Sequence, residues 1–177
     1  MFNRVNYIIK YYISIYKKGL LMKKEDVLHH LRAAKSAHIK WVQKAKMLIN
    51  GIEVSEDAIP VNSTECKFGI WFYSDGQILN SLSNNPLECM QSIESLHFEL
   101  HDIYLKIFSI YFSENKKPGF FAKLFGFNKK NITSIEQEKA KEYFHNMEQI
   151  SHELLDEINR LERRLLAVSE EKIDALV

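Results

Sequence analysis

The sequence feature that most constrains the fold is the recurrence of apolar residues every three or four positions along three long segments. Residues 83–112, SNNPLECMQSIESLHFELHDIYLKIFSIYF, give the clearest example, and residues 24–50 and 133–168 repeat the pattern. This spacing places apolar side chains on one face of an α-helix. No segment alternates apolar and polar residues as a half-buried strand does. We therefore expect an all-α fold in which long helices pack side by side.

The helical pattern divides the chain into three parts after residue 22. We expect residues 23–113 to form a helical bundle, residues 114–131 to form a linker rich in Lys, Gly and Phe, and residues 132–177 to form an amphipathic C-terminal helix. Thr133 and Glu136 have the spacing of a capping box at the start of that helix. Its apolar seam comprises Met147, Ile150, Leu154, Ile158, Leu161, Leu165 and Val168. The seam suits packing on the chain's own bundle or dimerisation with a second copy.

Two basic and aromatic segments raise the question of membrane contact. Residues 1–22 contain no acidic side chain, and Lys10 interrupts an apolar run that is too short for a transmembrane helix. They are either an interfacial segment or, as we favour, a leader outside the working protein, with translation starting at Met22. Residues 120–127, FFAKLFGF, are flanked by lysines. They would either touch a membrane surface or, as we favour, cover the open end of the bundle.

Charge and cysteine content exclude several classes of protein. The 24 basic side chains nearly balance the 23 acidic ones, which argues against a nucleic-acid-binding protein. The two cysteines, Cys66 and Cys89, cannot build a disulfide framework. A hydrophobic content of 46% is sufficient for a core that needs no such framework. We expect a cytoplasmic protein, because a reducing compartment keeps both thiols free.

The pair His97 and His101 is the strongest chemical signal in the sequence. Four residues apart on a helix, the two rings share one face among apolar neighbours, where an unpaired polar group costs about 1–3 kcal/mol. Zinc takes four ligands from imidazole and thiolate groups. The candidates for the other two ligands are His38, on the core-facing stripe of the first helix, and Cys66, at the start of a short helical segment. Alternatively, His38 is an ordinary core histidine and Cys66 is a small buried apolar residue.

Three short elements occur in a telling order. AHIKWV (37–42), CKFGIW (66–71) and HFELH (97–101) match H-x-x-W, C-x-[FL]-G-x-W and H-x-x-x-H. With these elements the chain resembles the bacterial chemoreceptor zinc-binding (CZB) domain over residues 24–112. The resemblance implies a four-helix-bundle zinc-binding domain, followed here by the long C-terminal helix. It implies zinc ligands at His38, Cys66, His97 and His101. It also implies that the residues packed around the site are Trp41, Gly69 and Trp71.

The resemblance further implies a function. Such domains regulate chemotaxis and other bacterial signalling, often as homodimers, and they respond to zinc or to oxidants such as hypochlorous acid that attack the zinc-bound thiolate, here Cys66. The sequence has no chemoreceptor signalling hairpin and no cyclase motif, so we expect its signal to pass to a partner such as a chemoreceptor or a diguanylate cyclase. The alternative is a zinc-stapled structural module that senses nothing. We do not expect an enzyme, because four protein ligands leave zinc no position for an activated water.

Overall fold

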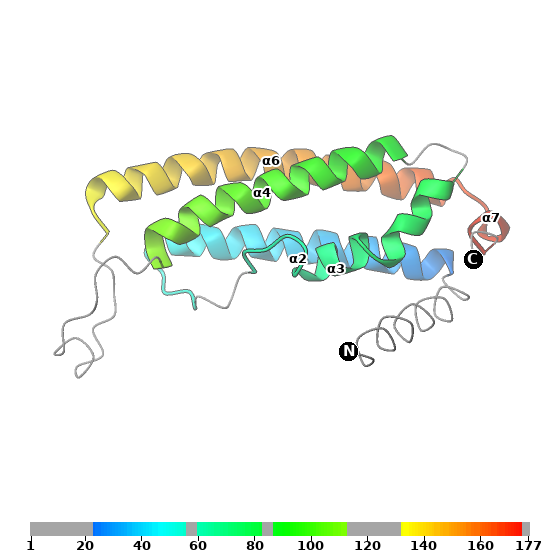
Figure 1. The fold of residues 1–177 in the computed structure, drawn as a ribbon, viewed down its shortest axis with the longest axis horizontal. Helices are drawn as coiled ribbons and strands as arrows, with labels where there is room; N and C mark the ends of the chain where they lie inside the picture. Colours follow the sequence, from blue (N-terminus) through cyan, green and yellow to red (C-terminus); the bar gives the residue numbers. More distant parts are fainter. Residues whose placement is uncertain (1–22, 56–59, 83–86, 113–131, 175–177) are drawn as a thin grey trace, which may run out of the picture.

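The computed structural model describes residues 23–55, 60–82, 87–112 and 132–174. Its helices are α2 (Lys24–Ile49), α3 (Lys67–Phe72), the 3-10 helix η2 (Asp75–Ser81), α4 (Leu87–Phe112), α6 (Ser134–Leu166) and α7 (Glu170–Asp174). The all-α prediction is confirmed, because the described residues contain no strand (Figure 1). The proposed leader (1–22) and the whole linker (114–131), with its 120–127 segment, lie outside the described residues.

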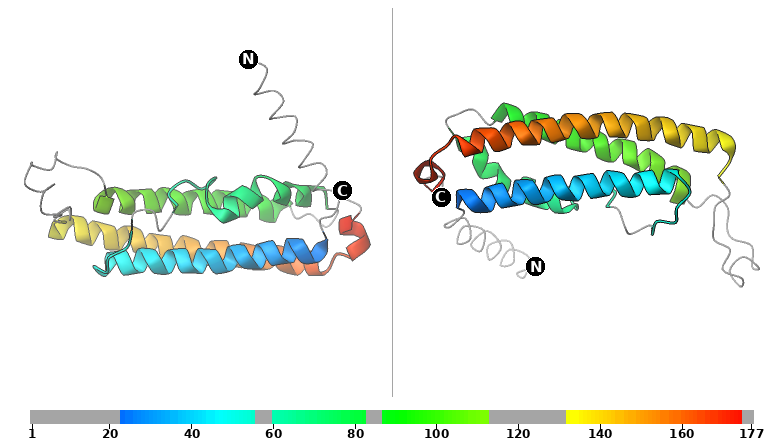
Figure 2. Two further views of the ribbon diagram at one scale, coloured as in Figure 1. Left: turned by 90° about the horizontal axis from the view of Figure 1, so that it is seen from below. Right: turned by 180° about the vertical axis from the view of Figure 1, so that it is seen from behind.

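Three long helices form the bundle, and a short one covers its side. α2, α4 and α6 run side by side in all views, and α6 packs against both α4 and α2 (Figures 1 and 2). The short helix α3 rests on α2, and η2 leads from it toward the start of α4. The C-terminal helix is therefore an integral part of its own chain's bundle, which answers a question that its apolar seam left open.

The apolar stripes read from the sequence are the buried faces of the helices. On α2 the buried members are Leu28, Leu31, Ala34, Trp41, Ala45, Leu48 and Ile49. On α6 every residue of the seam within the helix is buried except the half-buried Ile150. Apolar side chains on each of the facing helices are removed from water when the helices pack. This burial is the main force that holds the three long helices together.

The helix ends follow local rules that the sequence displays. At the end of α2, the backbone N–H of Gly51 donates to Leu48 and that of Ile52 donates to Met47, both at 3.0 Å. This pattern requires a left-handed residue after the helix, and Gly51 supplies it with a φ of 78°. At the start of α6, Thr133 Oγ1 accepts from the backbone N–H of Glu136, whose carboxylate accepts from Thr133 N. The predicted capping box is thus confirmed.

The segment after α3 differs from expectation. The sequence CKFGIWFYSDG (66–76) is typical of a short helix or a turn-rich segment that ends near Gly76, but the 3-10 helix η2 runs through this glycine to Ser81. Leu79 is fully buried there, and the side chain of Gln77 donates to the carbonyl of Phe72 at 2.8 Å. Burial and side-chain hydrogen bonds thus hold a polar, glycine-containing stretch in helical form.

Polar pairs set the register between α2 and α6. Arg32 forms an ion pair with Glu162 at 2.8 Å, and Lys35 donates to Asn159 at 2.6 Å. At the start of α2, the ammonium group of Lys24 donates to the carbonyls of Leu166 and Val168 at the end of α6. These contacts tie the beginning of one long helix to the end of the other.

Among the helices described here, none has the length and apolar character needed to cross a membrane.

Candidate metal centre

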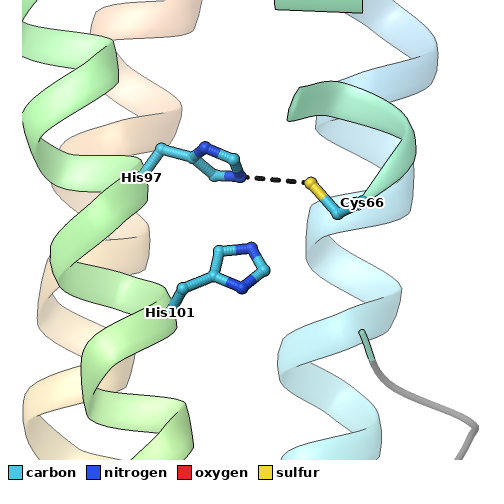
Figure 3. Close-up of side chains that lie close together, drawn as sticks. All are labelled: Cys66, His97 and His101. Carbon is cyan, nitrogen blue, oxygen red and sulfur yellow. Dashed lines mark hydrogen bonds between the residues drawn. The ribbon is translucent and has the colours of Figure 1, made fainter. Parts of the chain in front are cut away.

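The two histidines of α4 lie on one buried face, as their spacing predicts. Their ring centroids are 4.7 Å apart, and the rings meet edge to face at 83°. His97 is 1% exposed and His101 5% exposed. Both side chains extend from α4 toward α3, where Cys66 faces them (Figure 3).

Cys66 reaches the histidines because it is the N-cap residue of α3. Its Sγ accepts a hydrogen bond from the backbone N–H of Gly69 at 3.2 Å and lies 3.3 Å from the carbonyl of Ser63. The same sulfur lies 3.3 Å from His97 Nε2. Unlike the histidines, Cys66 is only half-buried. The helix start thus fixes the thiol between the α4 rings and the molecular surface.

A backbone carbonyl fixes which nitrogen of His101 can bind a metal. His101 Nδ1 lies 2.7 Å from the carbonyl oxygen of Val61. A carbonyl only accepts hydrogen bonds, so Nδ1 carries the proton and Nε2 keeps a lone pair. Histidine ligands of metals are commonly oriented by such a bond from their second nitrogen. The ring of His101 also stacks on Trp41, with centroids 4.5 Å apart.

His38 lies beside this group on α2. Its side chain is 6% exposed, and its ring centroid is 6.4 Å from that of His97. It lines the same pocket as Trp41, Cys66 and His101. Within the described part of the chain, His38 Nε2 is buried without a hydrogen-bond partner, and so is His97 Nδ1. An unsatisfied buried nitrogen costs about 1–3 kcal/mol, and a metal bond at His38 Nε2 would offset that cost for His38.

The donor atoms have spacings that suit zinc. One donor atom each from Cys66, His97 and His101 falls within 4.8 Å of the others. Zinc bonds of about 2.0–2.3 Å in tetrahedral geometry place neighbouring donors about 3.3–3.8 Å apart. The 3.3 Å between Cys66 Sγ and His97 Nε2 already matches that range. His38 is not a member of this close set, so its ring has to move toward the other three donors to form a fourth bond.

The electrostatics of the pocket keep all three imidazoles neutral. Burial, followed by repulsion from the neighbouring His101, lowers the pKa of His38 to about 4. Burial and the other two histidines lower the pKa of His97 to about 3. Burial also lowers the pKa of His101, against an opposing effect of its bond to Val61. Neutral imidazole is the form that binds a metal.

The thiol of Cys66 is affected in the opposite sense. Burial raises its pKa, and the backbone N–H groups of Gly69 and Phe68 reduce that effect without cancelling it. The position at a helix start, which favours a thiolate, is therefore outweighed by loss of solvent. A cation between the sulfur and the rings would restore the preference for thiolate.

The three residues expected to pack around the site have different contacts. The ring of Trp41 stacks directly on that of His101, and its centroid lies 5.4 Å from the centroid of the His38 ring. Gly69 leaves no space for a side chain, because a Cβ atom there would lie 1.8 Å from the carbonyl oxygen of Ser63. Trp71 is buried one step away, where its ring stacks on His30 at 5.9 Å.

Sequence reasoning missed two contributors to the site. The carbonyl of Val61 orients His101, and the ring edge of Phe68 meets His97 at 5.0 Å. A backbone carbonyl leaves no side-chain signal in a sequence, so Val61 had none. Phe68 occupies the [FL] position of the C-x-[FL]-G-x-W element, and the restriction of that position to a large apolar residue was the available clue.

Comparison with known proteins supports the assignment of this region. No curated protein and no solved structure gave a match to the chain. Residues 38–108 match the family model of the chemoreceptor zinc-binding domain, and this segment begins at His38 and includes Cys66, His97 and His101. Residues 38–108 are therefore similar to the chemoreceptor zinc-binding domain, as the three sequence elements led us to expect.

Proposed function

We propose that His38, Cys66, His97 and His101 bind one zinc ion and that the protein is a zinc-binding regulator in bacterial signalling. The observation that carries the proposal is that donor atoms of Cys66, His97 and His101 lie within 4.8 Å of one another, with His38 beside them in the pocket that Cys66 and His101 line. Soft sulfur and imidazole donors, with no carboxylate in the close set, favour zinc over calcium or magnesium.

The donor set supports regulation and argues against catalysis. Four protein ligands fill a tetrahedral zinc, which then has no open position for substrate or water. When bound, zinc would supply a positive charge that holds Cys66 as thiolate and joins three segments of the chain. Gain or loss of the metal would therefore change how α3 is attached to α2 and α4.

Cys66 is the residue through which an oxidant would act. It is the most exposed of the four proposed ligands, because it is only half-buried whereas the three histidines are buried. With hypochlorous acid, the thiolate sulfur loses two electrons and gains oxygen, giving a sulfenic acid, while the chlorine leaves as chloride. The product no longer carries the negative sulfur, so the hold on the metal weakens.

The output of such a regulator has to leave through another protein. We propose a cytoplasmic protein that acts as a homodimer or through a chemoreceptor or diguanylate cyclase, as the family resemblance implies. The exposed part of α4 is available for this, because Phe98 and Leu105 are 42% and 46% exposed. Neither residue is needed to fill the core of its own chain.

The second candidate function is a permanent structural zinc site. It is favoured by the near-complete burial of the histidines, which slows exchange of a bound metal. The two functions differ in lability. A sensor should release zinc to mild oxidant and recover it after reduction, whereas a structural site should keep zinc until the bundle unfolds.

Native mass spectrometry of the parent, Cys66→Ser and His97→Ala tests the proposal. We expect one zinc per chain in the parent, and loss or marked weakening in both variants, with the subunit number read from the same spectra. His152→Ala is the matched control, because His152 is an exposed histidine on α6. A parent that takes up no zinc, or variants that bind as the parent does, would refute the proposed site.

A further inference from the structure

Two pockets open on either side of Pro60, and both reach the candidate metal centre. One pocket is lined by Glu65 and Asp102 together with apolar residues of α4. The other is lined by Cys66 and His38. His101 and Pro60 line both. The centre therefore has two different approaches from solvent, and only the second includes the thiol.

The two approaches carry opposite charge. Lys40, Lys44 and Lys67 line the Cys66 pocket, and none of the described residues that line it is acidic. All three lysines are exposed residues, which places them at the rim of the pocket. The other pocket has two carboxylates and, among its described lining residues, no lysine or arginine.

A reagent that reaches Cys66 from solvent passes this basic rim. The thiol is half-buried, and the walls of its pocket are formed by Ala34, Trp41 and Phe68. Low-dielectric walls beneath charges of one sign concentrate the field in the opening and raise the local concentration of counter-ions. Such an opening favours negatively charged molecules and repels cations before any contact with the sulfur.

We propose that the basic rim selects small anions as the molecules that react with Cys66. This inference rests on the function proposed above and deepens it, because it names the chemical class of the stimulus. Anionic oxidants, such as the hypochlorite anion formed from hypochlorous acid, and anionic thiol reagents are preferred over neutral or cationic ones. The three lysines act as specificity residues and take no part in the reaction at sulfur.

Thiol–disulfide exchange with matched reagents tests the selection without any assumption about zinc. The dianion dithiobis(nitrobenzoate) and the neutral dithiodipyridine react alike. The Cys66 thiolate attacks one reagent sulfur, a new S–S bond forms, the reagent's own S–S bond breaks, and the released aryl thiolate carries away the electron pair. Peptide mass spectrometry assigns the adduct to Cys66 and excludes the buried Cys89. The protein is used as purified and again after chelator treatment, with zinc content measured on each sample.

The readout is the preference for the dianion, which is the rate of reaction of Cys66 with the dianionic reagent divided by its rate with the neutral reagent. This ratio is then divided by the same ratio measured for a small neutral thiol. We expect this preference for the dianion to exceed one severalfold at about 0.01 M salt and to approach one at about 1 M salt. Lys40→Gln and Lys67→Gln should each lower it about twofold to fourfold. Lys46→Gln removes the same charge from α2 at a residue paired with Glu148, and should leave the preference unchanged.

The outcomes separate this proposal from the zinc site. A preference of one in the parent, or an equal effect of all three substitutions, overturns the selection of anions even if one zinc is bound. A preference that depends on Lys40 and Lys67 in protein that takes up no zinc supports the basic rim while the zinc proposal fails.

Discussion

Gly69→Ala should push α3 away from the backbone at Ser63, in the segment that precedes the helix. A Cβ atom at residue 69 would lie 1.8 Å from the carbonyl oxygen of Ser63, whereas such contacts are essentially never shorter than 3.0 Å. Both atoms at this contact belong to the main chain or are fixed to it, so no side-chain rotation relieves the clash. The two backbone segments must separate by about 1 Å.

That separation acts on the site through two bonds of Cys66. Its sulfur accepts from the backbone N–H of Gly69 at 3.2 Å and lies 3.3 Å from the Ser63 carbonyl. Overpacking of this kind costs about 1–3 kcal/mol, and the disturbed hydrogen bond adds about 1 kcal/mol. We expect a loss of about 2–4 kcal/mol in unfolding free energy and a tenfold to hundredfold weaker hold on zinc, as for other residues that position metal ligands.

Urea denaturation with and without zinc, and competition with a chromogenic chelator, measure the two effects. Gly51→Ala is the matched control. Its φ of 78° strains an alanine, but no atom lies within 4 Å of the new Cβ, so it should cost about 1 kcal/mol and leave zinc affinity unchanged. If Gly69→Ala behaves like Gly51→Ala in both assays, the inference that the α3 turn holds Cys66 in place is wrong.

The metal-free protein should lose stability as the pH falls below 6.5, because His38 and His97, with pKa values lowered to about 4 and about 3, do not take up the protons that the unfolded chain binds. Each histidine lowers the free energy of unfolding by about 1.4 kcal/mol per pH unit in this range. The urea concentration at the unfolding midpoint, measured with chelator present, should therefore decrease as the pH is lowered from 6.5 to about 4. A midpoint that does not change with pH would contradict the burial of the two histidines. Thr133→Ala should cost about 1 kcal/mol by removing the α6 cap, with unchanged zinc affinity, and an unaltered midpoint counts against the cap. Lys24→Met should speed hydrogen exchange at the last turn of α6, which Lys24 caps, and uniform protection along α6 would rule out that role.

The helices were predictable because their determinants are local. Apolar spacing located α2 and α4, and Thr133 with Glu136 marked the start of α6. The 3-10 helix η2 was not predictable, since it depends on burying Leu79 against the rest of the molecule. The partner of α6 was also open, because one apolar seam serves its own bundle or another chain equally well. Pairs such as Arg32 and Glu162 specify the answer only once the two helices are side by side.

The candidate site was predictable to different degrees. The four-residue spacing alone places His97 and His101 on one face of a helix. That Cys66 would face them depends on where α3 rests on the bundle, which the family resemblance implied and spacing did not. His38 lies in the same pocket but outside the set of mutually close donors. The main-chain oxygen of Val61, which orients His101, has no counterpart in side-chain patterns.

The position of the donors along the chain has a consequence for the topology of unfolding. All four candidate ligands fall between residues 38 and 101, so a bound metal would close loops within that stretch and none that includes α6. Such closure reduces the entropy of the unfolded chain only inside the loops. Loss of the metal would therefore relax the segment that carries α3, while α6 stays docked on α4 and α2 through side-chain packing and ion pairs such as Arg160–Glu88. The α3 segment and α6 are thus attached to the bundle in different ways, and only the attachment of the α3 segment would depend on a metal bond that a cell can reverse.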